Sequence, residues 1–322
     1  MRFFPTSAHA KNISPFSPLA LKFVGAMFVL AVLAGCGSVE PLDEAVHSEL
    51  DSTSQEVVED NGLNLNGLSL NGLNLNGLSL NGLNLNGLST ETFSQWFGQN
   101  ASFNETVMRY VVRCAVPEGE SRTYTDALGK TYTWQGSLGL APGWSYGASA
   151  SVAEQQVVSA CLAAHTNKYG IRVPVSLLGR TAQGAEIPSS SGELATFFNR
   201  EACFFGNLFS GSGAVYVGAD WQQMDKRKSS TRACGLSSRS SGGSEDCAPL
   251  VHVGSCSSLC TLDASGTYYT SCTYNGVTYR PVTSRVNAES VYTCGDGTCQ
   301  FTERCGTGDT YDNCKLDCGT CG

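Results

Sequence analysis

The clearest helical pattern of apolar positions lies at 151–165, in the sequence SVAEQQVVSACLAAH. Apolar side chains recur there three and four residues apart, which is the spacing of one helix face. The stripe consists of Val157, Val158, Cys161, Leu162 and His165. Another helix is predicted to begin at Asn104, a favourable N-cap residue, and to end before Pro117.

Other segments have the pattern of strands. The sequence SRTYTDALGKTYTWQG at 121–136 predicts a hairpin around a Gly-containing turn, and GTYYTSCTYNGVTYRPV at 266–282 predicts a second hairpin over Asn275-Gly276. GIRVPVSLLG, AVYVG and LVHVG are also typical of strands. Because helices and strands are interspersed without regular β-α-β units, the expected fold class of the body is α+β.

A repeat of five residues separates this body from the N-terminal region. Asn-Gly-Leu begins each copy from Asn61 to Thr90, and its leucines match neither a helix face nor strict alternation. Asn-Gly is a strong turn dipeptide, and the repeat loosely resembles the pentapeptide-repeat family of β-solenoids. The repeat is therefore either a low-complexity spacer or a short solenoid cap on the body, with a ligand-binding surface as a third alternative.

The N-terminus has the pattern of a signal peptide. Basic residues precede the apolar run FVGAMFVLAVLAG, which at 23–35 is shorter than the roughly 20 residues that span a bilayer. Leu33-Ala34-Gly35-Cys36 resembles the lipobox of bacterial lipoproteins, and this resemblance implies cleavage before Cys36 and acylation of that cysteine. A plain secretory signal is the alternative. Two or three acyl chains would anchor the protein firmly to a lipid bilayer.

Charge and cysteine content narrow the function classes further. The net charge is −8, and residues 37–60 are acidic without Lys or Arg, so an extended tether is expected there and nucleic-acid binding is not. Fifteen cysteines in an exported chain indicate disulfides, and fourteen remain once Cys36 is set aside. The body contains Cys114, Cys161, Cys203, Cys234, Cys247, Cys256, Cys260 and Cys272. Four bridges are expected among them, with a pairing that spacing alone leaves open.

The last 29 residues form a separate cysteine-rich segment. Its cysteines are Cys294, Cys299, Cys305, Cys314, Cys318 and Cys321. CGDGTCQFTERC resembles small secreted modules written C-G-[DN]-G-x-C-x-x-x-E-x-C, and three disulfides are expected to hold so small a unit together. Five acids give it a candidate Ca²⁺ site, namely Asp296, Glu303, Asp309, Asp312 and Asp317. Solvated acids, or zinc held by Cys318 and Cys321, are the alternatives, and no other cofactor is expected.

Two candidate catalytic groups occur in the body. Gly143-Trp144-Ser145-Tyr146-Gly147 matches the G-x-S-x-G elbow of serine hydrolases, which needs a strand before the serine and a helix after it. Asp220 or Asp246, followed by His252, has the required chain order. The alternative is a plain loop, because Pro142 and Gly143 break a preceding strand.

The second candidate is Glu201. A helix is predicted to begin near Ser191, and its apolar stripe of Leu194, Phe197 and Phe198 continues into Glu201. A carboxyl buried on that stripe would have a raised pKa, as suits a general acid. The alternative is a hydrogen-bonded structural glutamate, paired with Arg200 or Arg180.

Four motifs resemble a family of secreted, uncharacterised myxobacterial-type proteins: VVRCAVPEG, GLAPGW, VVSACLAAHTNKYG and EACFFGNLF. The resemblance covers most of 105–290 and implies domain boundaries but no activity. The expected organisation is a signal peptide at 1–35, a tether at 36–60, repeats at 61–90, a disulfide-rich α+β domain at 91–293 and a cysteine-rich module at 294–322.

The expected function is that of a lipid-anchored outer-membrane or surface protein, facing the periplasm or the exterior. It would act as a non-enzymatic binding or structural module with an envelope or extracellular partner. A lipid-anchored hydrolase is the alternative.

Overall fold

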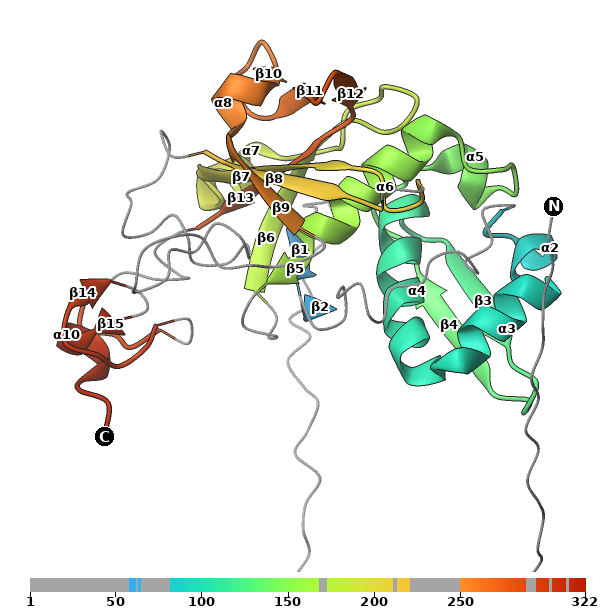
Figure 1. Ribbon diagram of the computed structural model, residues 1–322, viewed down its shortest axis with the longest axis horizontal. Coiled ribbons are helices and arrows are strands. Elements are labelled where there is room, and N and C mark those ends of the chain that lie inside the picture. The colour runs from blue at the N-terminus through green and yellow to red at the C-terminus, as the bar shows by residue number, and fades with distance from the viewer. Residues whose placement is uncertain are drawn as a thin grey trace, which may run out of the picture. The chain divides into compact units, whose positions relative to one another are not determined.

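The computed structural model confirms an α+β fold with a cysteine-rich C-terminal cluster (Figure 1). The structure describes residues 58–61, 63–64, 82–167, 173–210, 213–220, 250–287, 294–300, 303–310 and 313–322. Cys36, Cys234, Asp246, Cys247 and Asp312 lie outside these ranges. None of the helices in the described ranges combines the length and the apolar character that a bilayer crossing requires.

A six-stranded sheet forms the centre of the body, in the order β1-β6-β13-β7-β8-β9. Neighbouring strands are antiparallel, except that β8 and β9 are parallel. The strands are β1 (Val58–Asn61), β6 (Val173–Gly179), β13 (Val282–Val286), β7 (Asn199–Gly206), β8 (Val215–Ala219) and β9 (Leu250–Ser255). The predicted strands in GIRVPVSLLG, AVYVG and LVHVG are therefore confirmed.

The two faces of this sheet pack against different partners. Ala202 and Phe204 of β7 belong to the main hydrophobic core, and helix α6 (Val152–Ala164) packs on β7, β8 and β13. Cys203 and Phe205 belong to a second cluster, because successive residues of a strand point to opposite faces. That cluster joins the central sheet to a small sheet of β10 (Cys260–Leu262), β11 (Tyr269–Tyr274) and β12 (Val277–Tyr279). Figure 1 shows the small sheet beside β7 and β8.

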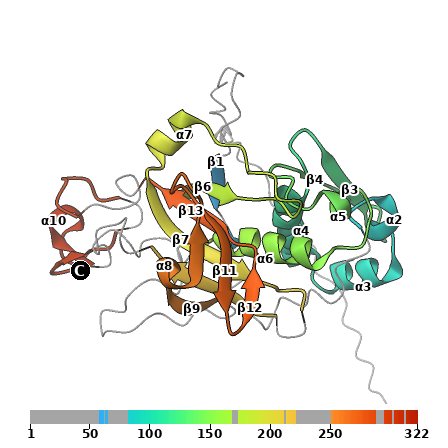
Figure 2. The same ribbon diagram turned by 90° about the horizontal axis from the view of Figure 1, so that it is seen from above.

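Capped helices and a hairpin complete the core. Helices α3 (Glu91–Gln99) and α4 (Ala101–Ala115) begin at Thr90 and Asn100, whose side chains accept hydrogen bonds from backbone amides of the first turn. Figure 2 shows α4 beside the hairpin of β3 (Ser121–Thr125) and β4 (Thr131–Gln135), and Figure 1 shows α3 close to β3. Edge-to-face aromatic contacts join them, including Phe97 to Tyr124 at 5.0 Å and Phe97 to Tyr132 at 4.8 Å between ring centroids.

The predicted helix through Glu201 is wrong. Helix α7 (Ser191–Thr196) ends before Phe197, and Glu201 lies on β7. Seven of the eight residues of β7 are buried, and β13 and β8 pair with it on either side. Pairing on both edges and burial on both faces stabilise this segment as a strand, so the tertiary context overrides the local pattern.

Part of the repeat belongs to the folded body. Asn61 ends β1, and β2 (Leu63–Asn64) pairs with β5 (Thr166–Asn167). At the other end of the repeat, Leu83 and Leu88 are buried in the main core, and Leu88 ends helix α2 (Leu85–Leu88). Both ends of the repeat are therefore held by the body, while residues 65–81 lie outside the described ranges.

Twelve cysteines of the described residues form six disulfides, which confirms the prediction of a disulfide-rich chain. The body pairs are Cys114–Cys161, Cys203–Cys256 and Cys260–Cys272. The C-terminal segment pairs its first cysteine with its fourth, its second with its fifth and its third with its sixth. These bridges are Cys294–Cys314, Cys299–Cys318 and Cys305–Cys321. Besides them, the segment contains β14 (Asp309–Thr310), β15 (Asn313–Cys314) and the short helix α10 (Lys315–Cys318).

Candidate functional site

Ser145 lies at the end of a four-residue helix, α5 (Pro142–Ser145), and no strand leads into it. The residue is fully buried. Arg122 donates through Nη2 to the Ser145 hydroxyl oxygen at 2.7 Å and to its carbonyl oxygen at 2.9 Å. The segment therefore differs from the strand–turn–helix context of a nucleophile elbow, because the serine ends a short helix and is bound by an arginine.

The other members of the predicted triad lie elsewhere. His252 is on β9, opposite Val217 of β8, and Figure 1 shows α5 and β9 in different parts of the body. Burial lowers the pKa of His252, and a backbone hydrogen bond at Gly254 partly opposes that effect. Asp246 lies outside the described residues. Within the described ranges, the structure does not bring Ser145 and His252 together.

Glu201 is almost fully buried, as its candidate role requires. Its carboxylate accepts a hydrogen bond from the Ser284 hydroxyl of the neighbouring strand β13, at 2.8 Å. The arginines that the sequence offered as partners form other contacts. Arg200 pairs with Asp220 at 2.7 Å, and Arg180 lies 3.5 Å from Glu186. These contacts fit the structural alternative for Glu201, a buried glutamate held between two strands.

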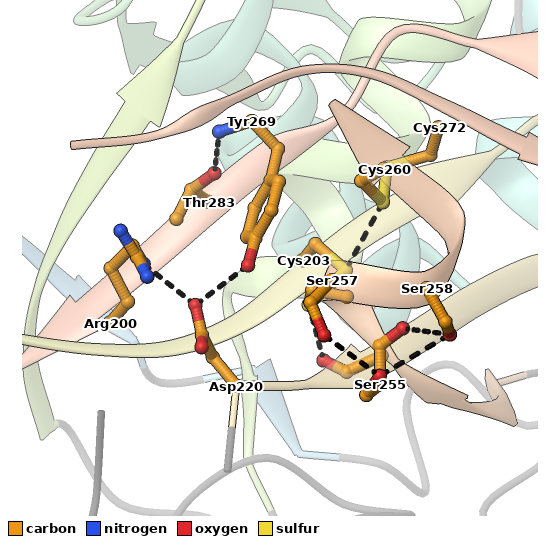
Figure 3. Close-up of a disulfide and its surroundings, with 12 residues drawn as sticks. Arg200, Cys203, Asp220, Ser255, Ser257, Ser258, Cys260, Tyr269, Cys272 and Thr283 are labelled. Atoms are coloured by element: carbon orange, nitrogen blue, oxygen red, sulfur yellow. Dashed lines mark hydrogen bonds and ion pairs between the residues drawn. A yellow bond between two sulfur atoms is a disulfide. The ribbon is translucent and has the colours of Figure 1, made fainter. Parts of the chain in front are cut away.

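Arg200, Asp220 and Tyr269 form a buried polar cluster that the sequence pattern did not reveal (Figure 3). Asp220 Oδ2 accepts hydrogen bonds from Arg200 Nε at 2.7 Å and from the Tyr269 hydroxyl at 2.9 Å. Burial, and then the negative charge of Asp220, raise the pKa of Tyr269. Asp220 is 20 residues from Arg200 and 49 from Tyr269, so only the pairing of β7 with β8 and the second sheet bring the three groups together.

Two disulfides lie in contact beside this cluster. The Sγ atoms of Cys260 and Cys203, which belong to different bridges, are 3.5 Å apart (Figure 3). Gly218 of β8 leaves room for the sulfurs, because a Cβ atom there would lie 2.8 Å from the Cys203 sulfur. Cys203 and Cys256 are fully buried and Cys272 is 1% exposed, whereas Cys260 is partly exposed.

The predicted calcium ligands are engaged with the backbone. The Asp317 carboxylate accepts hydrogen bonds from the amides of Gly295, Asp296 and Gly297. The Asp296 carboxylate accepts from the Thr298 amide, and Glu303 accepts from the Gln300 amide.

Amide donors that point at a carboxylate compete with a cation for the same oxygens, so these acids fit a structural role better than a Ca²⁺ site. Of the remaining predicted ligands, Asp309 is on β14 and Asp312 lies outside the described residues. The zinc alternative needs free thiolates, but Cys318 and Cys321 are each in a disulfide.

A surface depression of about 390 Å³ lies between α4 and β4, and its volume is in the range of small-ligand sites. Arg109 and Arg113 line it from one face of α4, and Thr133 and Gln135 line it from β4. Trp134, Glu118, Gly136 and Ser137 complete the lining. Trp134 is 2% exposed, and among the described residues its indole N–H has no hydrogen-bond partner.

No protein-family model matches this chain, and no curated protein or solved structure matches it either.

Proposed function

We propose that the protein is a lipid-anchored module of the bacterial envelope, fixed through acyl chains on Cys36, and that its body binds an envelope component. The observation that carries this proposal is the pairing of twelve cysteines in six disulfides. Such a set is maintained in an oxidising compartment outside the cytosol, which agrees with an N-terminus that has the pattern of an export signal.

The anchor is tested by replacing the acylated cysteine. Cys36→Ala should release the protein from the membrane fraction and abolish labelling with radioactive palmitate, because no acyl chain would remain. A matched control is Cys234→Ala, which leaves the lipobox intact and should remain in the membrane fraction. Palmitate labelling of Cys36→Ala would contradict the anchor.

The depression between α4 and β4 is the surface that we assign to ligand binding. Arg109 and Arg113 are four residues apart, so both side chains lie on one helix face above the depression. Glu105 already pairs with Arg109 at 2.7 Å, but the Arg109 side chain is 49% exposed and retains donors that face solvent. Guanidinium groups bind carboxylates through paired hydrogen bonds, so a polymer that bears carboxylates is the ligand class that fits.

Purified peptidoglycan, which carries free carboxylates, is a suitable probe. The full mature protein should sediment with it, and Arg109→Gln/Arg113→Gln should weaken sedimentation by about tenfold or more, on the scale of one or two charge-assisted hydrogen bonds. Lys130→Gln, which removes a positive charge outside the depression, is the control and should bind as the unaltered protein does. Equal sedimentation of all three proteins would exclude the depression as this binding surface.

A further inference from the structure

The two disulfides that are in contact, Cys203–Cys256 and Cys260–Cys272, differ in their exposure to solvent. Cys260 is partly exposed at the start of β10, so it is the member of these four cysteines that a thiol in solution can approach. Cys203 and Cys256 are fully buried, and no external thiol can approach them directly. Exchange of thiols and disulfides requires a thiolate to reach a disulfide sulfur. The contact of 3.5 Å between the sulfurs of Cys260 and Cys203 therefore provides a route from the surface to the buried bridge.

The framework around Cys260 does not depend on its own bridge. Strands β10 and β11 pair with each other, and Cys260 lies directly opposite Cys272 in that ladder. Strand β11 pairs further with β12. These backbone hydrogen bonds do not involve the bridge, so the ladder holds the backbone of Cys260 close to Cys203 when the bridge opens. A sulfur held at about 3.5 Å is close to the separation from which attack begins.

We propose that these four cysteines form a thiol–disulfide exchange site, whose substrate is a thiol-bearing molecule that enters at Cys260. A thiolate attacks the Cys260 sulfur and forms a mixed disulfide, while the bond to Cys272 breaks and the Cys272 sulfur takes the electron pair and a proton. A second thiol of the same substrate then attacks the substrate sulfur of the mixed disulfide. The substrate leaves as an oxidised disulfide, and the Cys260 sulfur leaves as a thiolate.

The released thiolate then attacks its neighbour. A bond forms between the sulfurs of Cys260 and Cys203, the bond from Cys203 to Cys256 breaks, and the Cys256 sulfur takes the electron pair and a proton. Two substrate thiols have thus been oxidised to one disulfide. The protein is left with a Cys203–Cys260 bridge and thiols at Cys256 and Cys272, so the electrons have moved from the surface to a buried sulfur.

The first experiment locates those thiols. The folded mature protein is treated with limiting dithiothreitol, quenched in acid, denatured and alkylated, and its peptides are mapped by mass spectrometry. The expected result is alkylated Cys256 and Cys272 together with a Cys203–Cys260 linked peptide. Alkylation of Cys260 and Cys272 with Cys203 linked only to Cys256 would overturn the proposal, and so would the absence of any alkylation at these four cysteines.

A second experiment needs no reductant. Cys272→Ser leaves Cys260 as a thiol beside the intact Cys203–Cys256 bridge. When this thiol attacks Cys203, a Cys203–Cys260 link forms and the Cys256 thiol is released. Some molecules should therefore be alkylated at Cys256 instead of Cys260. Cys161→Ser is the matched control. Among the described residues, its free Cys114 thiol lies near His165 and no second disulfide lies beside it, so alkylation should stay on Cys114. Alkylation confined to Cys260 in Cys272→Ser would contradict the exchange.

Discussion

Asp263 lies in the turn between β10 and β11, where its carboxylate accepts hydrogen bonds from the backbone amides of Ser265, Thr267 and Tyr268. The Ser265 hydroxyl donates to the same carboxylate. Burial acts to raise the pKa of Asp263, but these hydrogen bonds outweigh burial and lower the pKa to about 2. A sequence pattern could have found this turn, because Asp followed by Ser and Gly is typical of turns that an aspartate caps.

The lowered pKa of Asp263 predicts a dependence of stability on acid. Since the folded pKa lies below the ordinary value of 3.8, the carboxylate contributes its full stabilisation above about pH 4 and loses it as the pH falls to about 2. Asp263→Asn should therefore lower the melting temperature at pH 6 and lower it much less at pH 2. Thermal unfolding followed by circular dichroism measures this difference. A decrease of equal size at both pH values would contradict this explanation.

At the scale of single elements, Gly82 and Gly87 explain how the end of the repeat fits the core. A Cβ atom on Gly87 would lie 1.9 Å from the carbonyl oxygen of Gly82. The five-residue period thus places one glycine against the next, while Leu83 and Leu88, also five apart, both enter the core. Residues 82–88 therefore pack on the body, but they do so through the short helix α2 and not as the predicted solenoid cap.

Gly87→Ala should destabilise the body by roughly 1–3 kcal/mol, the range for substitutions that force a backbone shift in a packed core. Gly98→Ala is the control. No atom lies within 4 Å of a Cβ atom built on Gly98, which is inside α3, so alanine should stabilise by about 0.5–1 kcal/mol. Urea unfolding of the two variants measures the contrast. Equal unfolding midpoints would show that the glycine contact has no role.

Elements with strong local signals were predictable from the sequence. The α6 helix has a clear stripe and a capping box formed by Ser151 and Glu154, and the hairpin over Asn275-Gly276 has its expected turn. The strand at Glu201 was not predictable, since one of its two neighbours in the sheet, β13, comes from a segment far along the chain. For the same reason the Arg200–Asp220–Tyr269 cluster and the contact between two disulfides could not be inferred from spacing.

At the scale of the whole molecule, the count of cysteines makes a further prediction. Six disulfides account for twelve of the fifteen cysteines. With Cys36 acylated, Cys234 and Cys247 remain, and they should be linked to each other. Peptide mapping without reduction should find this link and no free thiol. A free thiol at Cys234 or Cys247 in the native protein would contradict it.

The attachment of both ends of the repeat to the body has a mechanical consequence. A tensile force applied to the chain before residue 58 acts first on β1. This strand lies at the edge of the sheet and, among the described strands, pairs only with β6. The force acts on the pairing of β1 with β6 first, and it reaches the pairing of β2 with β5 only when β1 detaches. Once β1 and then β2, which pairs with β5, have both detached, the roughly 20 residues between β1 and Leu83 could extend to about 65 Å. A tensile load would therefore separate these two strand pairs before it stretches the disulfide-braced core.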